Sequence, residues 1–131
     1  GGGSVLAAIS RSLRSYAEGI GGREQMAIEA FSGALEVIPR TLAENAGLDP
    51  VNTIIDLRKA HSEGKSEFGV NVYEGGVANM ASSKVFEPSR VVDQAIQSAT
   101  ETAVMILRID DVISSRASSP MDGGEFDGMG M

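Results

Sequence analysis

The sequence contains no cysteine and no tryptophan, and it is poor in basic residues. Without cysteine the chain can form neither a disulfide nor a thiolate metal site, as is usual for cytosolic proteins. It has 11 Lys and Arg against 18 Asp and Glu, so the formal net charge is −7. Nucleic-acid and anionic-membrane surfaces both need clustered Lys and Arg. We therefore predict a cytoplasmic protein with neither kind of partner.

Long apolar runs are also absent. None approaches the roughly 18 residues that span a bilayer, and the N-terminus lacks the basic and apolar segments of a signal peptide. We expect a soluble chain. Its 131 residues, 42% of them hydrophobic, are enough for one core. The sequence starts Gly-Gly-Gly-Ser without an initiator methionine, and we favour an internal part of a longer protein.

Apolar residues recur at steps of three and four through most of the chain, as on amphipathic helices. The pattern predicts helices over residues 5–18, 23–37, 41–45, 51 to about 60, and 89–107. Glycines at positions 19, 21 and 22 end the first helix. The second carries so broad an apolar face that we expect burial on more than one side. The last helix is predicted to be a central packing element.

Residues 38–50 form the main turn of the sequence. Pro39 opposes a continuous helix because it lacks a backbone N–H, and it is expected to bend and end the second helix. Gly47 supplies a left-handed stop after the short helix. Asp49 then offers an N-cap, followed by Pro50 at the first position of the next helix.

A strand pattern appears only between residues 65 and 88. Phe68, Val70 and Val72 alternate with small or polar residues, and Glu74-Gly75-Gly76 forms a turn. Residues 84–87 are predicted to be a second strand that pairs with the first, and residues 77–83 to be a short helix or a loop. Residues 109–113 are expected to extend as an edge strand.

The composition changes from Ser114 to mostly Ser, Gly, Asp and Met. We predict a flexible tail over residues 114–131, with 121–131 disordered when the chain is free. His61 is the single histidine, and the sequence offers no second nitrogen or sulfur ligand to build a metal site around it. We therefore interpret His61 as a surface residue near a helix C-terminus. The fold class is mainly α, with a small two-stranded β ribbon.

Gly1, Gly2 and Gly3 precede a helix, a geometry that lets backbone N–H groups approach a phosphate or a ribose. Three glycines before Ser4 are equally typical of a linker, so this signal alone decides nothing.

Five stretches, in order, resemble the group II chaperonins, the archaeal thermosome and its eukaryotic cytosolic relatives. They are the glycine triplet, Gly-Gly-Arg-Glu-Gln-Met-Ala-Ile-Glu-Ala-Phe at 21–31, Pro-Arg-Thr-Leu-Ala-Glu-Asn-Ala-Gly-Leu-Asp at 39–49, and two stretches at 87–91 and 103–113. The similarity covers residues 1–113. The resemblance implies the C-terminal half of an equatorial domain in an ATP-dependent double-ring folding machine, with a helical bundle of that type.

The same resemblance implies the site. In the family the glycine triplet approaches the nucleotide, which assigns Gly1, Gly2 and Gly3 to ATP or ADP. A strand and an acid flank the adenosine part, and the matching residues here are Asn71, Val72, Tyr73 and Glu87. A strand backbone and one carboxylate can satisfy ribose hydroxyls or base donors. Without the resemblance, Glu87-Pro88 would be interpreted as a capped helix start.

Two positions depart from the family pattern: Leu6 stands where an acid is frequent, and Val92 where a lysine is frequent, so a cation contact is lost there. The family's phosphate loop, Mg²⁺ carboxylate and catalytic aspartate match nothing in this chain. Since phosphoryl transfer depends on positioning and on the metal, we predict that the chain alone does not hydrolyse ATP appreciably, and no residue is assigned as catalytic or metal-binding.

The implied partners are the remaining chaperonin domains, neighbouring ring subunits and, through the parent complex, unfolded client proteins. The Met-rich tail resembles the flexible chaperonin tails, and its Met side chains suit weak contacts with unfolded chains. The alternative function is a non-enzymatic helical interaction or oligomerisation module. A small free-standing enzyme is disfavoured because the sequence shows no recognisable combination of catalytic residues.

Overall fold

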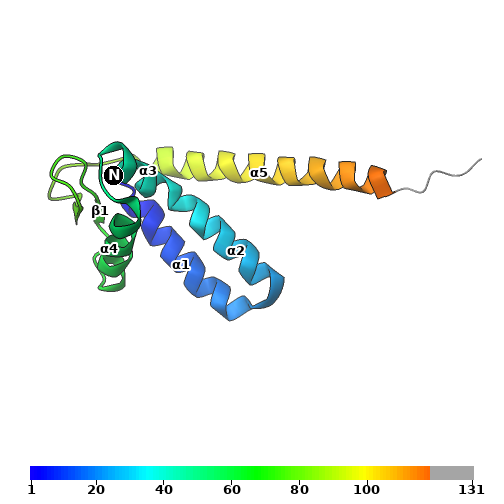
Figure 1. Cartoon of the computed structure of the whole chain (residues 1–131), viewed down its shortest axis with the longest axis horizontal. Coiled ribbons are helices and arrows are strands. Elements are labelled where there is room, and N and C mark those ends of the chain that lie inside the picture. The colour runs from blue at the N-terminus through cyan, green and yellow to red at the C-terminus, as the bar shows by residue number, and fades with distance from the viewer. Residues whose placement is uncertain (119–131) are drawn as a thin grey trace, which may run out of the picture. The chain divides into compact units, whose positions relative to one another are not determined.

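A computed structural model describes the backbone of residues 1–118 and the side chains of residues 1–109. The chain divides into two compact units, residues 1–87 and residue 88 onward, and each has its own architecture. The first unit contains four helices and a β-hairpin, and the second contains the long helix α5 (Figure 1). The prediction of a mainly α fold with a two-stranded ribbon is confirmed. No helix in the described part is long and apolar enough to cross a membrane.

Helices α1 (Ser4–Ile20) and α2 (Gly22–Leu35) lie side by side as a helical hairpin (Figure 1). Gly21 joins them with a φ of 71°, a conformation that favours glycine, and its N–H donates to the Ala17 carbonyl at 3.1 Å. The predicted end of the first helix is therefore confirmed.

The expectation of broad burial for α2 is wrong for the described residues. Ser32 is the one buried side chain of this helix, and Met26 is 71% exposed. The apolar face that the sequence shows on α2 is thus mostly open in this chain.

Helix α3 (Val37–Asn45) begins directly after α2, and the break between them falls at Glu36. This corrects the prediction that Pro39 itself ends the preceding helix. Pro39 lies in the first turn of α3, where the missing N–H would have had no intrahelical acceptor and the fixed φ suits the helix.

The end of α3 and the start of α4 (Pro50–Ser62) match their predicted signals. Gly47 has a φ of 74°, and the Leu48 N–H reaches the Ala43 carbonyl at 2.9 Å, as in a Schellman motif. The Asp49 side chain accepts from the N–H groups of Val51 and Asn52 at 2.9 and 3.1 Å.

The β-hairpin consists of β1 (Phe68–Val70) and β2 (Val77–Asn79), which are antiparallel with Gly69 opposite Ala78. The prediction of a second strand at residues 84–87 is wrong. A strand that starts just after the 74–76 turn closes a shorter loop and so pairs first. Residues 80–85 instead form a turn, in which the Val85 N–H donates to the Met80 carbonyl at 2.9 Å and Lys84 has a φ of 57°.

Helix α5 (Ser89–Ser118) contains the whole of the predicted last helix and continues through residues 109–113. The predicted edge strand there is therefore wrong, because the apolar spacing at residues 106, 109 and 113 keeps the helical step of three and four. Residues 114–118 of the predicted tail are also helical. Residues 119–131 lie outside the described part of the chain.

The core of the first unit takes one buried side chain from each of four elements: Ala7 of α1, Ala43 of α3, Leu57 of α4 and Val70 of β1. Small residues at two of these positions bring the helices close to the hairpin. This core fixes β1 beside α4 and the N-terminus of α1, where the predicted site residues lie (Figure 1).

Candidate functional site

The glycine triplet is packed against three different segments of the first unit. A Cβ on Gly1, Gly2 or Gly3 would lie only 2.6 Å from Val85, 2.5 Å from Met80 and 2.7 Å from Pro39, respectively. Gly2 and Gly3 also have positive φ values of 63° and 75°. Both the space and the backbone conformation therefore require glycine here.

The glycine triplet also contacts β1 of the hairpin, at Gly69 and Val70. The Val70 N–H donates to the Gly2 carbonyl at 2.8 Å, and a Cβ on Gly69 would meet the Gly2 oxygen at 2.8 Å. We call Gly1–Gly3 together with Gly69 the glycine junction. It places the end of β1, which residues 71–73 follow, and Val85, which precedes Glu87 by two residues, next to the start of α1.

Asn71 is buried, and its side chain organises the hairpin loop. Its oxygen accepts from the N–H groups of Tyr73 and Glu74 at 3.1 and 3.2 Å, and its amide nitrogen donates to the Glu74 carboxylate at 3.3 Å. These bonds hold an Asx turn that ends the strand at Val70. The sequence pattern had extended the strand to Val72.

Val72, Tyr73 and Glu87 project toward solvent. Val72 is 42% and Tyr73 89% exposed, and the Glu87 side chain has no hydrogen bond or ion pair within the described residues. The predicted site residues therefore lie toward one end of the unit. The glycine triplet and Asn71 are packed against other segments, whereas Val72, Tyr73 and Glu87 are exposed.

Four backbone donors at the start of α1 lack acceptors in the described part of the chain: the N–H groups of Gly2, Gly3, Val5 and Leu6. The neighbouring donors are used, since Ser4 donates to the Gly1 carbonyl and Ala7 to the Gly3 carbonyl. Gly3 is itself buried, where an unpaired N–H is uncommon. Free donors beside a helix N-terminus are the arrangement that phosphate oxygens fit.

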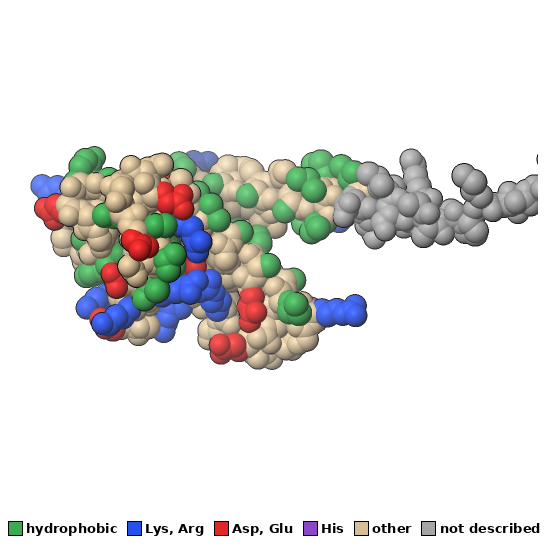
Figure 2. Space-filling model, in the orientation of Figure 1, with side chains coloured by type: hydrophobic (Ala, Val, Ile, Leu, Met, Phe, Trp, Pro, Cys, Tyr) green, Lys and Arg blue, Asp and Glu red, His purple; other side chains and the backbone are tan. Residues whose placement is uncertain are grey.

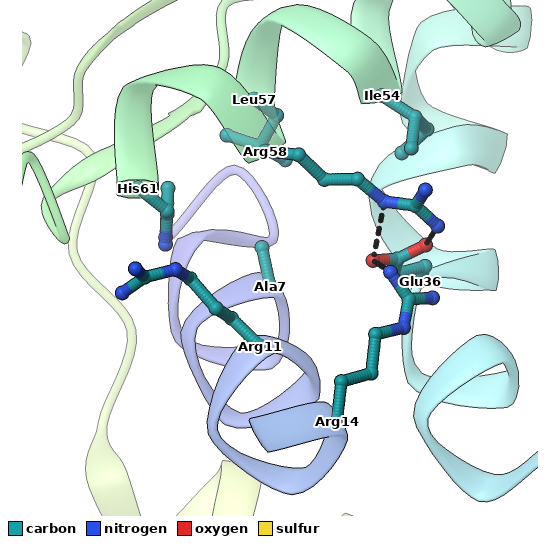
Figure 3. A pocket seen from close by; sticks show the side chains of 8 residues that line it. All are labelled: Ala7, Arg11, Arg14, Glu36, Ile54, Leu57, Arg58 and His61. Carbon is teal, nitrogen blue, oxygen red and sulfur yellow. Dashed lines mark hydrogen bonds and ion pairs between the residues drawn. The ribbon is translucent and has the colours of Figure 1, made fainter. Parts of the chain in front are cut away.

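Sequence reasoning missed a buried charge network on another side of the unit. Glu36 is 4% exposed, and Arg58 donates to both of its oxygens (Figure 3). Arg14 and Ser10 each donate to its Oε1 at 3.1 Å. We call Ser10, Arg14, Glu36 and Arg58 the Glu36 network. It connects α1, the junction of α2 with α3, and α4. The sequence signal was an acid at a helix break.

Burial alone would raise the pKa of Glu36, but the hydrogen bond and charge of Arg58, helped by Arg14, outweigh it and lower that pKa below its ordinary value. Arg58 has its pKa raised in return, chiefly by the hydrogen bond with Glu36. Both groups are therefore charged at neutral pH. The network stabilises the contact between α1 and α4 without any uncompensated buried carboxylate.

His61 lies near the end of α4 as predicted, but it is not a surface residue. It is 4% exposed, and its Nε2 donates to the Phe68 carbonyl at 2.7 Å. That bond covers an outward-facing carbonyl of β1, which the two-stranded sheet would otherwise leave unpaired. The polar sequence around His61 predicts a surface position, but it does not reveal that β1 packs on α4.

The described residues contain no group of three or more His, Cys, Asp or Glu side chains arranged to hold a metal ion.

Comparisons with known proteins decide the family. The model of the TCP-1/cpn60 chaperonin family matches residues 1–117. The chain belongs to this family. The resemblance to group II chaperonins is thereby confirmed, over almost all of the described chain.

Its relatives include thermosome subunits. Thermosome subunit alpha of Thermoplasma acidophilum is 53% identical over 131 residues, which are 100% of this chain and 24% of that protein. Thermosome subunit beta of the same organism is 56% identical over 116 residues, 88% of this chain and 21% of that protein. The chain thus spans about a quarter of the length of these relatives.

A solved chaperonin structure has a fold similar to that of this chain. The open-state monomer of a group II chaperonin from Methanococcoides burtonii matches with a TM-score of 0.79 and 50% identity, covering 82% of this chain and 27% of that one.

Proposed function

We propose that this chain is part of a group II chaperonin, an ATP-dependent chaperone that folds unfolded proteins in a double-ring chamber in the cytoplasm. Within it, residues 1–113 act as the C-terminal half of the equatorial domain and supply one wall of the nucleotide pocket.

The single observation that carries the nucleotide role is the set of free N–H groups at the start of α1. Gly2, Gly3, Val5 and Leu6 offer donors beside a helix N-terminus, and Gly2 and Gly3 have no side chain of their own there. Backbone donors and the helix dipole favour a phosphate group at this place. The phosphate end of ATP or ADP is the ligand that we assign to them.

The adenosine end is assigned to the open residues near the junction. The backbone of Val72 and Tyr73 and the carboxylate of Glu87 are accessible, so they can accept from ribose hydroxyls or the base amine. Asn71 has a different role in this proposal, because its side chain is engaged in the loop. It fixes the loop that presents Val72 and Tyr73.

Mg²⁺ and the catalytic groups are assigned to parts of the parent protein beyond this chain. Mg²⁺ binds carboxylates together with the substrate phosphates. The glycine junction supplies only backbone donors and carbonyls around the phosphate position. We accordingly expect no appreciable ATP hydrolysis by the chain alone.

Contacts with the remaining chaperonin domains and with neighbouring ring subunits are assigned to the open apolar face of α3 and α4. Val37, Ile38, Val51 and Ile55 are each more than half exposed. Large apolar side chains that are this exposed favour burial against another protein surface. This face gives the alternative, a purely non-enzymatic oligomerisation module, its best support.

The test is an NMR titration of the 131-residue chain with ATP. We expect the backbone amides of Gly2, Gly3, Val5 and Leu6 to shift together, because their N–H groups gain phosphate acceptors. Val72 and Tyr73 should shift with the adenosine part, and adenosine alone should move only these two.

Glu87→Ala is expected to weaken ATP binding about fivefold, or about 1 kcal/mol, which is the typical net contribution of one hydrogen bond. Glu18→Ala, which removes an exposed acid at the far end of α1, is the matched control and should leave the affinity unchanged. Phosphate release by the purified chain is followed in parallel. Shifts confined to other residues, or an ATPase rate abolished by Glu87→Ala, would contradict the proposal.

A further inference from the structure

A pocket of about 140 Å³ lies between α1 and α4, and the nucleotide proposal does not use it (Figure 3). It is lined by Ala7, Arg11, Arg14, Glu36, Ile54, Leu57, Arg58 and His61. Figure 2 shows basic side chains gathered over the region where α1 and α4 lie in Figure 1. This concentration of positive charge is notable in a chain whose net charge is −7.

The arginines have more donors than the pocket's one carboxylate can accept. Glu36 receives bonds from Arg58, Arg14 and Ser10, which fill the lone pairs of its Oε1. Each guanidinium has five N–H donors. Most of the donors on Arg14 and Arg58 therefore remain available to another acceptor.

Arg11 has no ion pair or hydrogen bond from its side chain within the described residues. Figure 3 shows its guanidinium on the His61 side of the pocket, whereas those of Arg14 and Arg58 surround Glu36. The eight lining residues thus carry three guanidinium charges against one carboxylate. An anion entering the pocket would meet a net positive charge and free, fork-shaped donors.

The base of the pocket is apolar and its volume is small. Ile54 and Leu57 line the pocket, and they are themselves almost fully buried, at 4% and 1% exposure. Pockets for drug-sized ligands measure about 300–1,000 Å³, so 140 Å³ fits a single side chain and excludes a nucleotide. The glycine junction residues do not line it.

We propose that this pocket binds the side-chain carboxylate of a glutamate or aspartate presented by another polypeptide. The methylene groups of that side chain lie on Ile54 and Leu57, and the carboxylate accepts from Arg11 and from the remaining donors of Arg14 and Arg58. The pocket is then an electrostatic docking point on the α1–α4 side of the unit, separate from the assigned nucleotide wall.

The experiment titrates the 131-residue chain with N-acetyl-glutamate amide and, in parallel, with its neutral counterpart N-acetyl-glutamine amide. Side-chain NMR signals of the arginine Nε–H groups and of the His61 ring report on the pocket. We expect the glutamate compound to shift the Arg11 and His61 signals saturably, and the glutamine compound to leave them in place.

Arg11→Gln is expected to weaken binding about fivefold to tenfold, since it removes one charge-assisted partner. Arg11 is exposed, so the fold should survive, and far-UV circular dichroism checks this. Arg23→Gln, at an exposed arginine of α2 outside the pocket, is the matched control and should leave the affinity unchanged. The affinity of Arg11→Lys should lie between those of wild type and Arg11→Gln, because lysine keeps the positive charge but lacks the paired N–H donors of the guanidinium group.

Three results would overturn the proposal: equal weakening by Arg23→Gln, equal binding of the glutamine compound, or no shift of the pocket signals. If Arg11→Gln failed to fold, Arg11→Lys would decide in its place. No nucleotide is present in these titrations, so their failure would leave the ATP proposal standing, and the reverse also holds.

Discussion

The glycine junction and the Glu36 network hold α1 to the rest of its unit by opposite means. The junction works through missing side chains, since a Cβ on Gly2 would lie 2.5 Å from Met80 Sδ. The network works through long side chains from α1 and α4 that meet a carboxylate at the α2–α3 break. One contact depends on close backbone packing and a hydrogen bond between backbone groups, and the other depends on charge.

This difference decides how each region should respond to change. Close backbone packing is indifferent to pH and salt, but it has no tolerance for added atoms. A charge network tolerates small shifts of its long side chains, but it weakens once its carboxylate is protonated. The junction is also the region to which the nucleotide is assigned, so its rigidity serves to fix free N–H groups.

The largest expected effect is at the junction. Gly2→Ala adds a Cβ within 2.5 Å of Met80 and 3.0 Å of the Val70 carbonyl, at a φ of 63°. We expect the free energy of unfolding to fall by about 3 kcal/mol, from strain and overpacking together. Urea denaturation followed by circular dichroism measures it.

Gly19→Ala is the matched control for that substitution. Gly19 lies within α1 with nothing within 4 Å of an added Cβ, so alanine should raise the free energy of unfolding by about 0.5–1 kcal/mol. If the two variants were equally stable, the junction would not be close-packed.

The next effect is at the network. Glu36→Gln leaves Arg14 and Arg58 without their shared counter-charge, and we expect a loss of about 2 kcal/mol at neutral pH, because these arginines are partly solvated. Glu63→Gln, in an exposed pair with Lys65, should change stability little.

The pH dependence sharpens this comparison. The pKa of Glu36 is lower in the folded chain than its ordinary value of 4.5. Its ionised form therefore stabilises the fold above that value, and the contribution is lost as the pH falls through the folded-state pKa. Urea titrations of wild type and Glu36→Gln at a series of pH values should show their difference shrinking on acidification. A difference independent of pH would refute the charge mechanism, and Gly2→Ala should show no such trend.

The smallest effect is at the cap of α4. Asp49→Ala removes the acceptor for the Val51 and Asn52 N–H groups and should lower the free energy of unfolding by about 1 kcal/mol. Asp56→Ala, at an exposed position within the same helix, is the control and should not destabilise. Equal losses in both variants would mean that acidic charge, and not capping, is what α4 requires.

Sequence patterns predicted well wherever the cause is local. The Gly47 stop and the Asp49-Pro50 start depend on backbone conformation and on a side chain two or three residues away, and both are confirmed. The family resemblance is confirmed as well, because it depends on residues in order along the chain. The free N–H groups beside the glycine triplet also follow from a local helix start.

The predictions that are wrong concern contacts between residues far apart in the sequence. The second strand was placed at residues 84–87 because those residues have strand propensity, whereas pairing went to the segment that closes the shorter loop. His61 was placed at the surface because its neighbours in sequence are polar, and its actual partner is the Phe68 carbonyl of the returning strand. The Glu36 network was not predicted because Ser10, Arg14 and Arg58 lie 22 to 26 residues from Glu36 in the sequence.

The order of the residues by itself determined the helical character, the caps and the family. Each of these depends on torsion angles and spacings within a few residues. Tertiary structure alone decided which segments pack on the glycines, that His61 is buried, and that Arg14 and Arg58 gather around Glu36. Those outcomes require separate helices to be brought within hydrogen-bond distance, and only the packing of the core at Ala7, Ala43, Leu57 and Val70 does that.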